Sequence, residues 1–161
     1  MELITLKSPR EQEAMRRAGR IAAQARALAG SMVRPGATTK EIDDAVRRFI
    51  RSRRAEPSFL NYHGFSGSAC ISVNEVVIHG IPSKRTVLRE GDIVSIDVGA
   101  FLDGFHGDCA ATYPCGAISD EARRLIDATR QSFWEGFRFA KAGCRVSDIS
   151  HAVQVYVEGH G

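Results

Sequence analysis

Residues 93–113 read IVSIDVGAFLDGFHGDCAATY, and this stretch decides the fold. Two segments of alternating polarity, 93–102 and 105–113, flank the dipeptide Asp103-Gly104. Asp-Gly between alternating segments is the strongest short-range signal for a β-hairpin, and a two-residue turn fixes the register of the strands. We therefore predict an antiparallel pair that matches Leu102 with Phe105, Gly99 with Asp108, and Asp97 with Ala110.

The two faces of this hairpin differ in chemistry, because the side chains of a strand alternate between faces. The apolar face is expected to pack against helices and carries Val94, Ile96, Val98, Ala100, Leu102, Phe105, Cys109, Ala111 and Tyr113. On the polar face, Asp97 and Asp108 are diagonal neighbours, roughly 7–8 Å apart at Cα. Gly99 lies opposite Asp108, and we expect it to leave room between the two carboxylates.

Two carboxylates on one sheet face repel each other, and Asp is uncommon in strands. A divalent metal ion bound by both would keep them ionised. The hairpin leaves two alternatives open, a pair of acids that shares a proton and a polar face that is merely solvated.

Two helices are predicted before the hairpin. Ser8-Pro9 with Glu11 has the pattern of a capping box with proline at the first helical position. That helix ends before Pro35-Gly36. Thr38, with a second glutamate at Glu41, starts the next helix.

Short apolar runs at 69–73 and 76–78 predict two further strands. After the hairpin, helical spacing returns from Ser119 and ends at Gly143, and a last helix begins near Ser147.

The last two predicted helices resemble the first two at an offset of 107 residues. This offset aligns the apolar positions Ile42, Ala45, Val46, Phe49 and Ile50 with Ile149, Ala152, Val153, Tyr156 and Val157. We predict a first repeat at about 8–113 and an incomplete second repeat at about 115–161. On this interpretation the 161 residues are the N-terminal portion of a longer domain and fold only marginally alone.

The composition is that of a soluble globular chain, with 43% hydrophobic residues, 25% charged residues and a net charge of +3. No apolar run is long enough to span a membrane. The segment Met1–Thr5 lacks the charged region followed by an apolar region with which a signal peptide begins, so we expect a cytoplasmic protein. The four cysteines form no Cys-x-x-Cys pair, which argues against a zinc ribbon.

Three motifs resemble signatures of the type I methionine aminopeptidases. Asp97-Val98-Gly99, followed by GFHGD at 104–108, resembles the metal-binding hairpin of that family. NYHGF at 61–65 and SVNEVVIHGIP at 72–82 resemble two more. The resemblance covers the whole chain. It implies an α+β pita-bread (creatinase/aminopeptidase) fold, with pseudo-symmetric αβ halves around a curved antiparallel sheet and an incomplete second half here.

The resemblance implies a metallo-exopeptidase that removes the N-terminal methionine from nascent polypeptides. It uses up to two divalent ions, of cobalt, manganese, iron or zinc, held by two Asp, one His and two Glu. Asp97 and Asp108 match the two Asp, and Asp108 is the bridging ligand. His79 matches the catalytic, substrate-contacting His. The residues implied for the methionine pocket are Phe59, Tyr62, Phe65 and Cys70.

The other three ligands of the family pattern have no match in this chain, so we expect negligible activity from the 161 residues alone. Two alternatives stay open, a non-catalytic pita-bread binding module that associates with the ribosome or RNA, and a proline-specific peptidase of the same fold. We expect a monomer without membrane contact. Two interpretations stay open for the basic cluster of α-helical spacing, a merely solvated helix face and a contact with the ribosome; its members are Arg47, Arg48, Arg51, Arg53 and Arg54.

Overall fold

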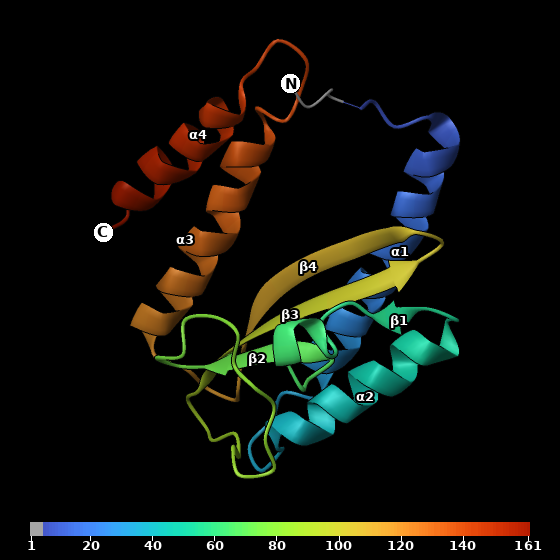
Figure 1. Cartoon of the computed structure of the whole chain (residues 1–161). Coiled ribbons are helices and arrows are strands. Elements are labelled where there is room, and N and C mark those ends of the chain that lie inside the picture. Colours follow the sequence, from blue (N-terminus) through green and yellow to red (C-terminus); the bar gives the residue numbers. More distant parts are fainter. Residues whose placement is uncertain (1–4) are drawn as a thin grey trace. The chain divides into compact units, whose positions relative to one another are not determined.

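The computed structural model describes residues 5–161, which form two compact units, one that ends at Ala117 and one that runs from Ile118 to Gly161 (Figure 1). Met1–Ile4, on which the expectation about a signal peptide partly depends, lies outside the described residues. Among the helices described, none has an apolar stretch of the length that a membrane crossing requires.

Two helices of the first unit begin where their capping boxes predict. Helix α1 spans Pro9–Ser31 and helix α2 spans Thr39–Ser52. The Ser8 hydroxyl accepts a hydrogen bond from the Glu11 amide, and the Glu11 carboxylate accepts one from the Ser8 amide at 2.7 Å. Thr38 caps α2 in the same way. Each box satisfies amides that the first turn of a helix otherwise leaves unpaired.

The predicted hairpin is confirmed. Strand β3 spans Ile93–Leu102 and strand β4 spans Phe105–Pro114. Between them Asp103 takes φ 51° and Gly104 takes φ 85°, the positive values that a two-residue type I′ turn requires. The register matches the prediction at Leu102 with Phe105, Gly99 with Asp108, and Asp97 with Ala110.

Strand β3 is the centre of a four-stranded antiparallel sheet. Strand β2, Ala69–Val73, pairs with its first half, as the apolar run at 69–73 predicts. The short strand β1, Glu56–Pro57, pairs with its second half. Strand β4 lies along the opposite edge, so every strand of the sheet contacts β3.

The strand predicted at 76–78 is wrong. Asn74 takes φ 52° and turns the chain away from β2, which leaves Val77 84% exposed. The outer edge of β2 is instead approached by Gly80, whose carbonyl accepts a hydrogen bond from the Ile71 amide at 2.9 Å. A Cβ at Gly80 would lie 2.2 Å from the Ile71 carbonyl oxygen, so a side chain there would prevent this contact.

The apolar face of the hairpin packs against α1 and α2, as predicted. Val94, Ile96, Val98 and Ala100 are fully buried. The helices contribute mostly alanines from α1 and aliphatic side chains from α2, namely Ala22, Ala25, Ala29, Ile42, Val46 and Ile50. Burial of each large aliphatic side chain stabilises the fold by about 1.5–3 kcal/mol. This packing leaves the opposite, polar face of β3 outside the core.

The second unit is a pair of helices, α3 at Asp120–Phe137 and α4 at Val146–Glu158. Both lie where the sequence predicts, and Ser119 caps α3 through the amide of Ala122 at 3.1 Å. The helices approach each other at Gly136, where a Cβ would lie 2.7 Å from a methyl group of Val153. The repeat boundaries at 8–113 and 115–161 stay a prediction.

Candidate active site

Strand pairing places the candidate ligands on the polar face of the sheet. Cys70 of β2 lies opposite Asp97 of β3, and Asp97 lies opposite Ala110 of β4. Gly99, two residues along β3, lies opposite Asp108. Directly paired residues of an antiparallel sheet share a face. Cys70, Asp97 and Asp108 therefore lie together on the face that points away from the core.

The two carboxylates are close enough to affect each other. Burial, followed by a hydrogen bond to the Asp108 carboxyl and its negative charge, raises the pKa of Asp97 to about 6. The positive charge of His79 acts on the same pKa in the opposite direction. These effects reveal repulsion between two acids on one face and place His79 within electrostatic reach of Asp97.

A divalent cation fits this pair of donors. Carboxylate oxygens are the hard, anionic ligands that such ions take, and a cation between them would cancel the repulsion that raises the pKa of Asp97. Across residues 5–161, however, no cluster of three or more His, Cys, Asp or Glu side chains is placed to hold a metal ion. The pair therefore fits as two ligands of a site that needs further donors.

The room expected beside Gly99 is filled. A Cβ at Gly99 would lie 2.7 Å from both the Phe59 ring and the Ser58 side chain. Ser58 is held there because its amide donates to the Gly99 carbonyl at 3.0 Å and its hydroxyl bonds Nδ1 of His106 at 2.9 Å. Glycine thus brings the Phe59 ring, rather than an open space, onto the face that carries Asp97.

The other residues expected in the methionine pocket come from the segment that leads into β2. Cys70 is 7% exposed, and burial followed by the negative charges of Asp97 and Asp108 raises the pKa of its thiol to about 11. The thiol is therefore neutral and behaves as a small apolar group. Phe65 is half-buried, whereas Tyr62 is 67% exposed in the 3₁₀ turn Tyr62–Gly64.

His79 is exposed and takes φ 58° in the loop that follows β2. Its neighbour Gly80 is fastened to β2 through Ile71, as described above, and the Gly80 amide also donates to the Ser72 hydroxyl at 3.0 Å. The backbone beside His79 is therefore fixed against the strand that carries Cys70.

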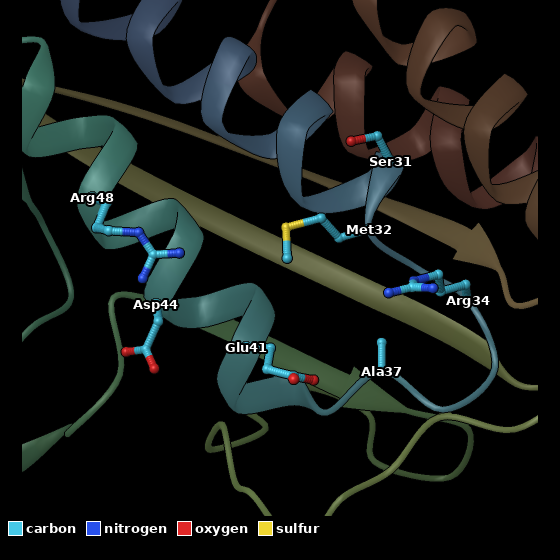
Figure 2. A pocket seen from close by; sticks show the side chains of 7 residues that line it. All are labelled: Ser31, Met32, Arg34, Ala37, Glu41, Asp44 and Arg48. Carbon is cyan, nitrogen blue, oxygen red and sulfur yellow. The ribbon is translucent and has the colours of Figure 1, made fainter.

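Two further hollows are found in the structure, one in each unit. One, of about 420 Å³, lies where α1 ends and α2 begins, and Figure 2 shows its lining residues, Ser31, Met32, Arg34, Ala37, Glu41, Asp44 and Arg48. The other, of about 340 Å³, is lined by α3, α4 and the segment between them, with Glu135, Phe139, Asp148, His151, Ala152, Val155 and Tyr156. Neither includes a residue of the candidate site.

Three of the five arginines of the basic cluster have partners within the first unit. Arg47 donates to the Ser68 hydroxyl at 2.8 Å. Arg51 lies 3.9 Å from the carboxylate of Glu56. The guanidinium of Arg53 lies 5.0 Å from the centre of the Phe49 ring. The carboxylate near Arg51 offsets part of its charge, whereas the contacts of Arg47 to Ser68 and of Arg53 to Phe49 hold the side chains in place without neutralising them.

Sequence reasoning missed a polar pair on the buried face of α2, since Thr39 and Asp43 are both 0% exposed. The signal was available in their spacing of four residues, which places them on one face of the helix, next to the buried Ile42 and Val46.

Residues 13–161 match the family model described as metallopeptidase family M24. Methionine aminopeptidase 1 of Bacillus subtilis is 51% identical over 156 residues, which cover 97% of this chain and 62% of that protein. The methionine aminopeptidase of Clostridium acetobutylicum is 47% identical over 159 residues, which cover 99% of this chain and 64% of that protein. The chain thus spans less than two thirds of the length of these curated relatives.

Solved structures agree with these matches. The methionine aminopeptidase of Thermotoga maritima superposes with a TM-score of 0.96 at 38% identity, over 99% of this chain and 64% of that chain. Aminopeptidase P of Escherichia coli superposes with a TM-score of 0.82 at 24% identity, which shows the fold alone. The pita-bread fold expected from the sequence is confirmed. By these matches, the chain belongs to metallopeptidase family M24.

Proposed function

We propose that the protein carrying this sequence removes the N-terminal methionine from newly made polypeptides by metal-dependent hydrolysis. The observation that carries the proposal is one sheet face with two interacting carboxylates, Asp97 and Asp108, beside the neutral thiol of Cys70 and the ring of Phe59. The printed names of the relatives support the choice of substrate.

Asp97 and Asp108 would hold the divalent metal ion, of cobalt, manganese, iron or zinc, together with donors from outside the described residues. The chemistry supplied there is Lewis-acid polarisation of the scissile carbonyl and a water that ionises near neutral pH. Without a cation, burial and Asp108 keep a proton on the Asp97 carboxyl up to about pH 6. Residues 5–161 offer two of the five expected ligands, so we expect the 161-residue chain alone to have negligible activity.

The remaining site residues would bind and orient the substrate. The neutral Cys70 thiol and the Phe59 ring, with Phe65 and Tyr62 on the segment that precedes them, suit the apolar, polarisable side chain of methionine. His79, fixed at its backbone by Gly80, would donate a hydrogen bond to the carbonyl oxygen as its charge increases during attack.

Nascent polypeptides are the proposed partners, and we place the reaction in the cytoplasm, where they emerge. We propose that the protein acts as a monomer. Any ribosome contact would depend chiefly on Arg48 and Arg54, the two cluster members for which the described residues provide no ion pair or aromatic contact.

The test is release of methionine from the peptide Met-Ala-Ser by the gene product that carries this sequence. Asp97→Asn should lower the rate by at least about a hundredfold and lower the bound metal, because a neutral amide replaces an anionic ligand. Asp103→Asn is the matched control in the same hairpin, since Asn-Gly supports the same turn. Full activity of Asp97→Asn at normal metal content would contradict the proposal.

A second candidate is a non-catalytic binding module of the same fold. It is favoured by one observation, that the described residues bring together no third metal ligand. RNA binding that weakens with salt and with Arg48→Glu would support it. A proline-specific peptidase has less support, because the likeness to aminopeptidase P extends to the fold alone.

A further inference from the structure

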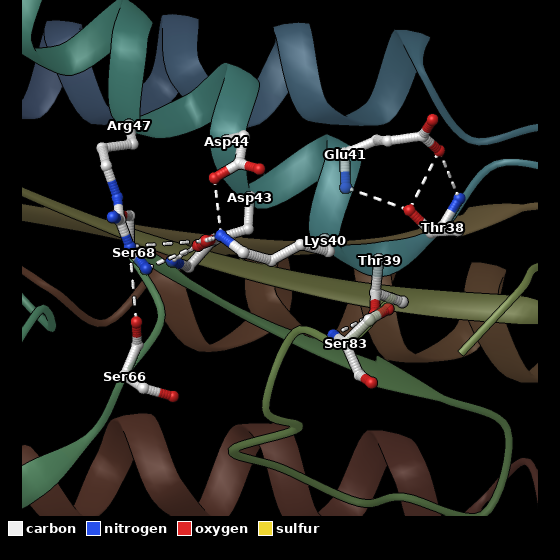
Figure 3. A network of polar contacts seen from close by, with 11 residues as sticks. Thr38, Thr39, Lys40, Glu41, Asp43, Asp44, Arg47, Ser66, Ser68 and Ser83 are labelled. Carbon is white, nitrogen blue, oxygen red and sulfur yellow. Dashed lines mark hydrogen bonds and ion pairs between the residues drawn. The ribbon is translucent and has the colours of Figure 1, made fainter. Parts of the chain in front are cut away.

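Helix α2 carries three polar side chains in a row on its inner side, Thr39, Asp43 and Arg47 (Figure 3). Their spacing of four residues stacks them one turn apart. Thr39 and Asp43 are 0% exposed, and the Arg47 side chain is 29% exposed. Buried polar atoms destabilise a fold unless each finds a partner. The partners of this polar row are therefore informative about its role.

Asp43 binds the start of β2. Its Oδ1 accepts hydrogen bonds from the backbone amides of Ser68 at 2.5 Å and Ala69 at 3.1 Å. Its Oδ2 lies 3.1 Å from the Lys40 ammonium, which balances the charge. Hydrogen bonds from amides to a carboxylate are stronger than neutral ones. The backbone just before Cys70 is thus fixed to α2 by a buried anion.

Arg47 holds the same segment from the next turn of the helix. Its Nε donates to the Ser68 hydroxyl at 2.8 Å, and a terminal nitrogen donates to the Ser66 carbonyl at 3.3 Å. That terminal nitrogen also lies 3.7 Å from Oδ2 of Asp43. The planar guanidinium therefore links the carboxylate and the segment 66–68 into one network (Figure 3).

Thr39 holds a second segment, the loop that carries His79 and continues to Ser83. Its hydroxyl donates to the Ser83 carbonyl at 3.1 Å and accepts from the Ser83 amide at 2.9 Å. The Thr39 amide donates to the Thr86 carbonyl at 3.0 Å. Since Gly80 is bonded to β2, the loop that carries His79 is fastened at two places, to the strand and to α2.

We propose that Thr39, Asp43 and Arg47 are positioning residues for the candidate active site. Asp43 and Arg47 fix the approach to Cys70, and Thr39 fixes the loop that follows His79. The roles given to Cys70 and His79 rest on the proposed function, whereas the anchoring itself does not. The same helix thus sets the position of the pocket wall and of the catalytic histidine, each through its own contact.

Asp43→Asn tests the anchor with its shape preserved. The charge is lost and one oxygen becomes a donor, so the amides of Ser68 and Ala69 lose their ionic acceptor. Their hydrogen exchange should accelerate by about tenfold or more, and alkylation of the Cys70 thiol should accelerate with it. Asp44→Asn is the matched control, because Asp44 pairs with the same Lys40 ammonium, whereas the amides of Ser68 and Ala69 donate to Asp43.

Kinetics of the gene product that carries this sequence separate positioning from stability. Asp43→Asn should raise KM for Met-Ala-Ser by about tenfold with little change in kcat, because the wall of the methionine pocket at Cys70 moves. Thr39→Val should lower kcat by about tenfold, because the His79 loop moves, and Thr39→Ser should restore it. Thr39→Val also keeps the inference testable if Asp43→Asn does not fold.

Faster exchange at Ser68 and Ala69, together with this split between KM and kcat, supports the inference. Wild-type exchange in Asp43→Asn, or equal changes of KM and kcat in both variants, overturns it. A wild-type protein without peptidase activity counts against the proposed function only, because the exchange and alkylation rates are measured without turnover and still decide whether α2 holds the two segments.

Discussion

The two helix pairs of this chain have similar amphipathic sequences and very different burial. Six residues of α1 and five of α2 are buried, against two of α3 and none of α4. In the first unit a sheet covers the apolar face of the helices, whereas α3 and α4 have only each other within theirs. Amphipathic spacing predicts which face of a helix is apolar, and the tertiary partner decides how much of that face is buried.

This difference predicts unequal stability of the two units. Local unfolding is easiest where few apolar groups are buried and hydrogen bonds are exposed. Phe133 is 60% exposed and Trp134 is 51% exposed in α3. We therefore expect α3 and α4 to open before the sheet and its helices do.

The largest effect is expected from a matched pair of truncations at the predicted repeat positions. Ile42 of α2 is 0% exposed, and Ile149 of α4 is half-buried. Ile42→Ala should lower the free energy of unfolding by about 2–5 kcal/mol, and Ile149→Ala by less than half as much. Urea denaturation of both variants measures the difference. Equal losses of unfolding free energy would contradict the expected inequality between the two units.

A second pair of substitutions adds a methyl group at a glycine where two secondary-structure elements pack together, once in each unit. A Cβ at Gly107 would lie 2.3 Å from the Gly19 backbone nitrogen, where α1 crosses β4, and cannot be accommodated by a side-chain rotation. Gly107→Ala should destabilise by about 1–3 kcal/mol. Gly136→Ala meets only side-chain methyls and a carbonyl at 3.3 Å, and it gains about 1 kcal/mol of helix propensity, so its net effect should be near zero. Thermal unfolding of the two variants tests this order.

The stability of the first unit should depend on pH and on metal through Asp97. The pKa of Asp97 is raised to about 6 in the fold, above its ordinary value, so the folded state binds the proton more tightly than the unfolded chain does. Stability from this group is present at low pH and is lost as pH rises through about 6. Urea midpoints in EDTA should therefore fall more steeply between pH 5 and 7.5 in the wild type than in Asp97→Asn.

Manganese ions should restore the stability that is lost as pH rises, and only in the first unit. Free ion at ten times its Kd stabilises the binding state by about 1.4 kcal/mol. Hydrogen exchange should slow in β3 and β4 and stay unchanged in α3 and α4. Equal protection of both units would show binding elsewhere.

The smallest effects are expected at the helix caps. Thr38→Ala removes the capping hydroxyl of α2 and should lower the free energy of unfolding by about 1 kcal/mol. Ser119→Ala should reduce the helix content of the second unit without a shift in the midpoint of the first, because α3 adds little to the buried core. Circular dichroism and tryptophan fluorescence of Trp134 separate the two responses.

The hairpin and its register could be predicted because they depend on local chemistry. Asp103-Gly104 permits one tight turn, and strand alternation then places Asp97 and Asp108 on one face. The two capping boxes at Ser8 and Thr38 are local in the same sense. Such features need no knowledge of distant partners.

The features that were missed depend on distant partners. The run 76–78 has the composition of a strand, but Gly80 takes the edge of β2 that such a strand needs. The glycine at Gly99 was expected to leave space, and Phe59, forty residues earlier, fills it. The spacing of Asp43 indicates the apolar face of α2, but its partners could not be predicted, because only the fold brings the amides of Ser68 and Ala69 to it.

The most direct test of the carboxylate pair as a metal site is an anomalous-scattering map from crystals of the gene product grown with Mn²⁺. The strongest peak should lie on the polar face of the β3–β4 hairpin, within coordination distance of both Asp97 and Asp108, and should be lost in Asp97→Asn. A strongest peak that touches neither carboxylate, or one that persists unchanged in Asp97→Asn, would contradict a metal site at this pair.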